Sequence, residues 1–150
     1  MNLSSYPFSL TGATRYIFIS EGKKNIEKAV EFTQLKISNT YNIAFGDTLP
    51  DGSIDDMAIS NNGDIIKVLA TVVKILENFL DKFPESTVFF AGSTEERTML
   101  YGRIMKTYYS EFEEKFDISA FIVLKEELRQ VAFEPTKNLN YNAFFIKRIS

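Results

Sequence analysis

The sequence predicts an α+β fold with one mainly antiparallel, twisted sheet of six to eight strands and two long helices, in the order ββββ-α-β-α-ββ. Three observations support this prediction. Short apolar or alternating runs separated by turn residues occupy positions 15–60 and 118–149, as strands do. Two longer segments, 65–83 and 94–116, repeat apolar residues at helical spacing. One apolar run, 88–91, lies between them. Strands grouped before and after the helices favour an antiparallel sheet in a single domain spanning residues 1–150.

The first half of the chain is expected to form four strands after an irregular lead-in over residues 1–15. Each is bounded by turn residues such as Gly, Asn and Asp, and they cover residues 15–21, 26–37, 41–46 and 54–60. The first is apolar on both sides, which suits a strand covered on both faces or a short edge strand. The third places Tyr41, Ile43 and Phe45 on one face.

The longest helix is predicted over residues 65–83, where apolar side chains follow the helical period until Pro84 ends the pattern. Asp64 is the expected N-cap residue. A strand–helix–strand crossover is expected around this helix, with the usual right hand.

The second helix is predicted over residues 94–116, directly after a buried central strand at 88–91. Gly102 lies inside this helix and weakens it by about 1 kcal/mol relative to Ala, unless a close approach requires a small residue there. Further strands are expected at 118–124 and 141–149. Residues 125–134 fit either a helix or a turn that leads into a strand.

Composition excludes several kinds of chemistry. The 150-residue chain has a formal net charge of -3, so nucleic acid is not expected as a partner. It contains no Cys and no His, which removes the commonest nucleophile, base and metal ligands, and neither a metal nor a cofactor is predicted. No signal peptide and no apolar run of membrane length are present. A cytoplasmic location without membrane contact is therefore expected.

A polar corner at residues 92–97, Gly-Ser-Thr-Glu-Glu-Arg, is the first candidate site. The glycine lets a strand turn sharply into a helix, which leaves backbone N–H groups unpaired at one point. Ser93, Thr94 and these N–H groups can hold an oxyanion or carbonyl, with Arg97 supplying positive charge. The alternative is structural: Ser93 and Glu96 match a capping box, and two glutamates at the helix start would repel an anion.

Two polar stretches lie before the long helix. Asn61 and Asn62, followed by Gly63 and Asp64, can accept a ligand such as a phosphate at the helix start, or can simply cap the helix. Five carboxylates suit Mg²⁺ or Ca²⁺, but their spacing matches no EF-hand, and solvated loop charges are the commoner reason for such a cluster. These residues are Asp47, Asp51, Asp55, Asp56 and Asp64.

An aromatic stripe on the second helix can line a ligand groove or a partner interface, or can belong to the core. At helical spacing the core is the commoner role. The stripe comprises Tyr101, Tyr108, Tyr109, Phe112 and Phe116, with Phe89 and Phe90 on the preceding strand.

Three groups of residues resemble a family of small bacterial single-domain proteins of unknown function. The resemblance covers nearly the whole chain and implies no particular activity. The residues that show it are Ala44-Phe45-Gly46-Asp47 with Ile54-Asp55-Asp56, then Ile59 to Asp64, then Gly92-Ser93-Thr94 with Arg97-Thr98 and Leu100-Tyr101.

The order of elements from residue 26 is also similar to that of the GNAT superfamily of acetyl-coenzyme A dependent N-acyltransferases. Their last characteristic helix carries Asn-x-x-Ala-x-x-Leu-Tyr, which this chain matches at Leu100 and Tyr101 but not at Thr94 and Arg97. The resemblance implies acetyl-CoA as cofactor and Tyr101 as the acid that protonates the departing thiolate. The family's glycine-rich pyrophosphate loop is replaced here by residues 61–64.

These observations favour a non-catalytic binding or regulatory domain that uses the polar corner, with a small protein partner or a second copy of itself. The alternative is an acyl-CoA-dependent N-acyltransferase-like enzyme with Tyr101 as general acid and Asp55 or Asp56 as base. A metal-dependent phosphoesterase built on the aspartates is a third hypothesis.

Overall fold

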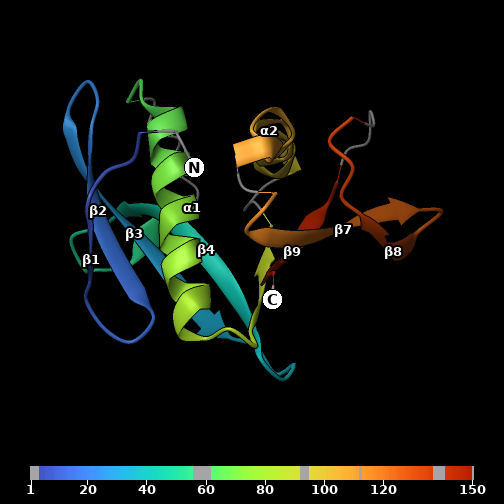
Figure 1. The fold of residues 1–150 in the computed structure, drawn as a ribbon. Helices are drawn as coiled ribbons and strands as arrows, with labels where there is room; N and C mark the ends of the chain where they lie inside the picture. The colour runs from blue at the N-terminus through green and yellow to red at the C-terminus, as the bar shows by residue number, and fades with distance from the viewer. Residues whose placement is uncertain (1–3, 56–61, 92–94, 112, 137–140, 150) are drawn as a thin grey trace.

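The computed structural model describes residues 4–55, 62–91, 95–111, 113–136 and 141–149. One nine-stranded sheet forms the body, and both α-helices lie on the same face of it (Figure 1). The strands are β1 (Phe8–Leu10), β2 (Arg15–Glu21), β3 (Asn25–Gln34), β4 (Thr40–Thr48), β5 (Ile54–Asp55), β6 (Thr87–Phe90), β7 (Phe116–Leu124), β8 (Glu127–Ala132) and β9 (Ala143–Arg148). The helices are α1 (Ile65–Lys82) and α2 (Glu95–Thr107), with a short 3₁₀ turn at Tyr109–Glu111.

The strand order is β1-β2-β3-β4-β6-β9-β7-β8, with β5 paired to β4. Among the described strands, β4 and β6 are the one parallel pair and the other pairs are antiparallel. This confirms the α+β class and the mainly antiparallel sheet. It also confirms the crossover, because α1 lies between the parallel strands β4 and β6 in the chain.

Two short or exposed strands could not be assigned from the sequence pattern alone. The lead-in contains β1, whose three residues are too few to show alternation. Residues 125–134, which fitted a helix or a strand, form a tight turn and β8. Both turn residues, Lys125 and Glu126, have positive φ angles, of 49° and 66°. This is the backbone geometry of a type I′ hairpin.

α1 contributes more buried apolar residues to the core than any other described element. Its apolar stripe packs on β2, β3 and β4, where the ring of Phe79 stacks on Phe32 with centroids 3.9 Å apart. Both rings are almost completely buried, and burying a side chain of this size stabilises the fold by roughly 1.5–3 kcal/mol. Within the described residues, no helix is both long and apolar enough to cross a membrane.

The start of α1 corrects one expectation. Asp64 occupies the N-cap position, but its side chain makes no capping hydrogen bond. Its carboxylate instead accepts hydrogen bonds from the hydroxyls of Tyr6 (2.6 Å) and Ser20 (2.5 Å). The long-range partners therefore replace the local cap.

α2 is shorter than expected, since it ends at Thr107 and not near residue 116. A 3₁₀ turn follows α2, in which the Glu111 N–H donates a hydrogen bond to the Tyr108 carbonyl. This turn returns the chain to the sheet, where β7 begins at Phe116. Inside α2, Gly102 is buried, and a Cβ added there would lie 3.4 Å from the Phe144 ring. A small residue thus allows the close approach of α2 to β9.

Candidate functional site

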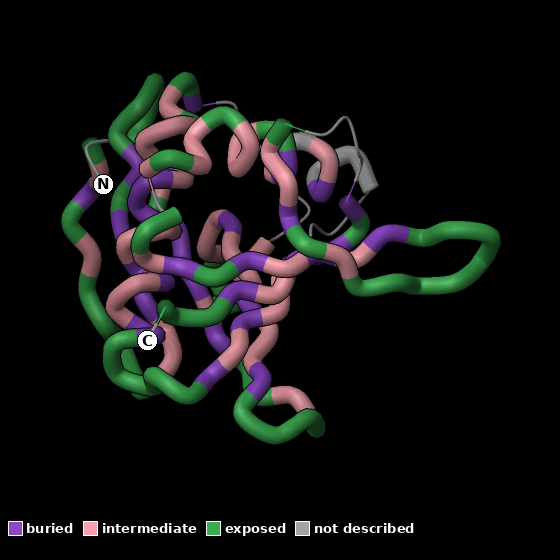
Figure 2. The backbone as a smooth tube through the Cα atoms, turned by 45° about the vertical axis from the view of Figure 1, so that its right-hand side comes forward, coloured by how far each residue is buried: buried purple, intermediate pink, exposed green. Residues whose placement is uncertain are grey.

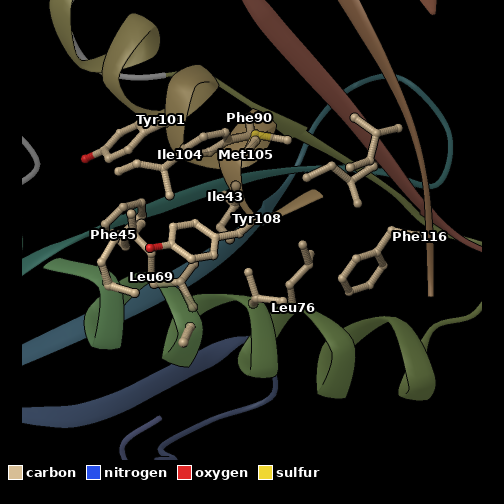
Figure 3. Close-up of a pocket in the computed structure, with 16 residues that line it drawn as sticks. Ile43, Phe45, Leu69, Leu76, Phe90, Tyr101, Ile104, Met105, Tyr108 and Phe116 are labelled. Carbon is tan, nitrogen blue, oxygen red and sulfur yellow. The ribbon is translucent and has the colours of Figure 1, made fainter. Parts of the chain in front are cut away.

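A pocket lies between α1 and α2 on the helix-covered face of the sheet (Figure 3). Its cavity volume is about 90 Å³. Residues from both helices and from four strands line it, and all of them are apolar or aromatic. They are Ile43, Phe45, Ile66, Leu69, Ala70, Val72, Val73, Leu76, Phe90, Tyr101, Ile104, Met105, Tyr108, Phe116, Ile118 and Ile146.

The pocket exists because each helix packs on a different part of the twisted sheet. α1 is held over β3 by the stacking of Phe79 on Phe32. α2 is held over β6 and β9, where the Tyr101 ring lies 5.3 Å from the Phe90 ring and Gly102 meets Phe144. The facing sides of the two helices therefore line the pocket together.

Several lining side chains are only half-buried, although they are apolar. Leu69 and Val73 on α1 face Ile104 and Met105 on α2 across the pocket, and all four are half-buried. Elsewhere on α1 the side chains that touch the sheet, such as Phe79, are fully buried. Apolar surface is thus left partly uncovered on the inner side of both helices.

The surface of the pocket is apolar, although two of its lining residues are tyrosines. Among the described lining residues, the tyrosines Tyr101 and Tyr108 alone carry oxygen atoms on their side chains. Figure 3 shows both phenol oxygens on the same side of the pocket, the side on which Phe45 and Leu69 lie. A charged group placed in this pocket would be desolvated without a counter-charge from the lining, so the pocket suits an uncharged, apolar group.

Asn62, one of the predicted binding residues, is buried in a separate polar network. Its side chain accepts from the Lys24 backbone N–H (2.9 Å) and donates to the Lys24 carbonyl (2.7 Å) and to Ser20 Oγ (2.9 Å). Its own carbonyl accepts from the Lys23 N–H (2.9 Å). The amide is thus occupied in joining the start of α1 to the β2–β3 turn.

Tyr6 completes this network from the N-terminal segment. Its hydroxyl donates to Asp64 and accepts from the Glu21 N–H (3.0 Å), while its backbone N–H donates to Thr71 Oγ1 (2.8 Å). Burial and the hydrogen bond to Asp64 raise the pKa of the Tyr6 phenol above its ordinary value of 10.0. We refer to Tyr6, Ser20, Lys24, Asn62 and Asp64 as the polar strap.

The polar corner falls largely outside the described residues. Ser93 and Thr94 lie outside them, as does Asn61, and the side chain of Arg97 is not described, although its backbone belongs to α2. Their predicted role in binding stays a prediction. Tyr101 is the predicted site residue that the structure places in the pocket.

The described aspartates do not form a cluster of carboxylates at one point. Asp47 is opposite Asp55 across β4 and β5, and its Oδ1 lies 2.6 Å from Lys28 Nζ. Asp51 lies in an exposed loop, where hydrogen bonds from Ser53 lower the pKa of its carboxyl. Asp64 belongs to the polar strap. Within the described part of the chain, no group of three carboxylates could hold a metal ion, and Asp56 lies outside that part.

The sequence indicated one wall of the pocket but not the other. The aromatic stripe contributes Tyr101, Tyr108 and Phe116, and the preceding strand contributes Phe90. Tyr109 lies off the pocket, with its ring 5.6 Å from that of Phe133, and Phe112 is outside the described residues. The opposite wall, from Ile66 to Leu76 on α1, has the pattern of an ordinary core helix, and no signal in the sequence distinguishes it from one.

Comparison with family models matches residues 2–149 to one described as "Family of unknown function (DUF6934)". Neither the curated proteins nor the solved structures give a match.

Proposed function

The chain belongs to the DUF6934 family of unknown function, and we propose that it is a non-catalytic binding domain whose pocket between α1 and α2 takes a small, largely apolar molecule. The observation that supports the proposal most is the uncovered apolar surface on both inner helix faces around one cavity. Small-molecule sites are usually clefts or cavities lined predominantly by apolar and aromatic side chains.

The size of the cavity limits what it can enclose. An apolar cavity of about 150 Å³ is known to admit benzene, and this one has about 90 Å³. A short alkyl chain suits it better than a ring, with any larger part of the ligand lying outside the enclosed space. A complete acetyl-CoA molecule is far larger than the cavity.

The chemistry of the lining favours a neutral ligand. The apolar walls would remove the hydration of a carboxylate or an ammonium group. Among the described residues that line the pocket, no side-chain oxygen contributes to its surface. We therefore assign the pocket a small neutral molecule whose alkyl chain enters the cavity.

Binding of two matched probes tests this assignment. Pentan-1-ol is expected to raise the melting temperature of the protein, whereas pentanoate at the same concentration should leave it unchanged. The Val73→Phe variant should bind pentan-1-ol roughly fivefold more weakly, because the added ring occupies part of the cavity. Tyr109→Phe, a change off the pocket, should bind it as the wild type does. Equal effects of the alcohol and the carboxylate, or no effect of either, would contradict the proposal.

The acyl-transfer alternative finds no support among the described contacts. The residues that stand in place of a pyrophosphate loop include Asn62, whose amide is fully occupied in the polar strap, and Asp64, whose charge would oppose a phosphate. Tyr101 is proposed here as a lining residue of a binding pocket, not as a catalytic acid. The cytoplasmic location and bacterial source stay predictions from the sequence.

A further inference from the structure

The β7–β8 hairpin stands out from the body of the protein as an arm. Figure 1 shows it extending away from both helices, and Figure 2 shows that its outer half is exposed. β8 is the last strand of the sheet, and within the described residues no strand pairs with its outer edge. An uncovered strand edge of this kind can add a further strand.

The backbone of β8 has a definite set of outward hydrogen-bonding groups. On β7, the Phe121 carbonyl and the Val123 N–H bond to Asn142, on the side away from β8. Because successive residues alternate, Ile122 and Leu124 direct their groups toward β8, where they are opposite Arg129 and Glu127. The groups of Leu128 and Gln130 on β8 therefore point outward from the sheet.

The side chains near this edge are exposed and apolar on one face. Leu128 is 64% exposed and the facing Val123 is 52% exposed. Both lie on the sheet face opposite the helices, in line with Phe121, whose ring is 4.9 Å from Phe145. A strand added at the edge would extend this apolar strip.

The charges on the other face of β8 are self-complementary. Glu127 and Arg129 flank Leu128, and they form an exposed pair within one chain, with 3.2 Å between Arg129 Nη2 and Glu127 Oε2. If a second β8 pairs antiparallel with Leu128 opposite Leu128, each Glu127 faces an Arg129 of the other copy. This register also brings together the outward backbone groups of the two Leu128 residues.

We infer that the occupant of this edge is a second copy of the same chain, joined through an antiparallel β8–β8 contact centred on Leu128. Two cross-strand Glu127–Arg129 pairs flank one Leu128–Leu128 contact in this arrangement. Since the arms protrude, they overlap near their ends while the two bodies stay apart. The contact is small, so the association is a weak one that depends on protein concentration.

Charge-reversal variants can distinguish Glu127–Arg129 ion pairs between two chains from the ion pair within one chain. Arg129→Glu places four acidic groups at its own contact, and Glu127→Arg places four basic groups there. Each variant alone is expected to self-associate roughly tenfold more weakly than the wild type in sedimentation measurements over a concentration series. An equimolar mixture of the two variants restores opposite charges at both positions, so it should associate within about threefold of the wild type. A mixture as weak as the separate variants would overturn the inference, as would a wild type that stays monomeric throughout the series.

A disulfide measurement tests the register, because the chain contains no native cysteine. Leu128→Cys should form a disulfide-linked dimer on mild oxidation, since directly opposite residues lie within reach of a disulfide. Gln130→Cys is the matched control. In the inferred register its two copies are offset by four residues and lie too far apart to join. Formation of a disulfide-linked dimer by Gln130→Cys and not by Leu128→Cys would overturn the inferred β8–β8 register.

Discussion

The polar strap and the pocket between the helices show opposite relations between chemistry and burial. In the strap, polar side chains of the kind that sequence analysis associates with ligands are buried and bonded to one another. In the pocket, apolar side chains of the kind associated with cores are left partly uncovered. Asn62 is 3% exposed with its amide fully engaged, whereas Leu69 and Ile104 are half-buried around a cavity. The type of a residue therefore says less about ligand binding than whether its polar groups are already hydrogen-bonded and its apolar surface already buried.

Because the strap is fully bonded, changes in it are expected to reduce stability and to leave binding in the pocket intact. Changes in the pocket are expected to alter ligand binding and to have little effect on stability.

Gly22→Ala should have the largest effect. A Cβ at this position would overlap the backbone carbonyl of Asn62, which neither chain segment can avoid without breaking the strap. We expect a loss of about 3 kcal/mol in the free energy of unfolding, measured by urea denaturation. Gly12→Ala is the control, because a Cβ there meets nothing within 4 Å. Similar losses in the two variants would show that the close approach at Asn62 is not a constraint.

Two identical substitutions on α1 compare the packed core with the pocket. Val68 is 4% exposed and lies off the pocket, whereas Val73 lines it. Val68→Phe should cost about 2 kcal/mol by overpacking, and Val73→Phe should cost less than about 0.5 kcal/mol because the ring can enter the cavity. Urea denaturation of both variants measures the difference. Equal losses would mean that the space between the helices does not exist in solution.

Asn62→Ala should destabilise the protein by about 2 kcal/mol, because it leaves the Lys24 backbone groups and Ser20 without their partner. Its affinity for pentan-1-ol should stay that of the wild type. Asn42→Ala, at a half-buried asparagine on β4, is expected to change stability by less than about 0.5 kcal/mol. Weaker pentan-1-ol binding by folded Asn62→Ala protein would instead link the strap to the pocket.

Tyr6→Phe should cost about 1 kcal/mol at neutral pH, since the Asp64 carboxylate loses one of its two hydroxyl donors. The pKa of Tyr6 is raised in the folded protein, so the unfolded chain loses its phenolic proton first. The contribution of Tyr6 is therefore complete below pH 10 and falls as the pH rises through the raised pKa. The difference in unfolding free energy between wild type and variant should shrink above pH 10. A constant difference at high pH would show that the hydroxyl is not a buried donor.

The sequence predicted the fold well where one physical signal dominates. α1 was placed within one residue because its apolar period is strong and Pro84 follows it. β8 stayed ambiguous because all but one of its residues are exposed, so burial imposes no alternation on it. The end of α2 was misplaced because the apolar period continues through Tyr108 into β7, although the backbone turns at Thr107.

The candidate site was predictable only in part. The tyrosine stripe on α2 identified Tyr101 and Tyr108 as candidates, but helical spacing cannot tell whether the surface opposite is packed or empty. That depends on the angle of two helices over a twisted sheet. Asn62 and Asp64 have the residue types of a site, and their partners Tyr6, Ser20 and Lys24 come from segments that no local pattern connects to them.

The most direct test of the binding proposal is methyl NMR spectroscopy of the wild type and of Val73→Phe under xenon pressure. Xenon enters apolar cavities, so the wild type should show shifts concentrated on the methyl groups of Ile43, Leu69 and Ile104, with none at the fully buried Val30. Val73→Phe should show no such shifts. Xenon shifts spread evenly over the surface, or unchanged in the variant, would contradict the claim that a binding cavity lies between α1 and α2.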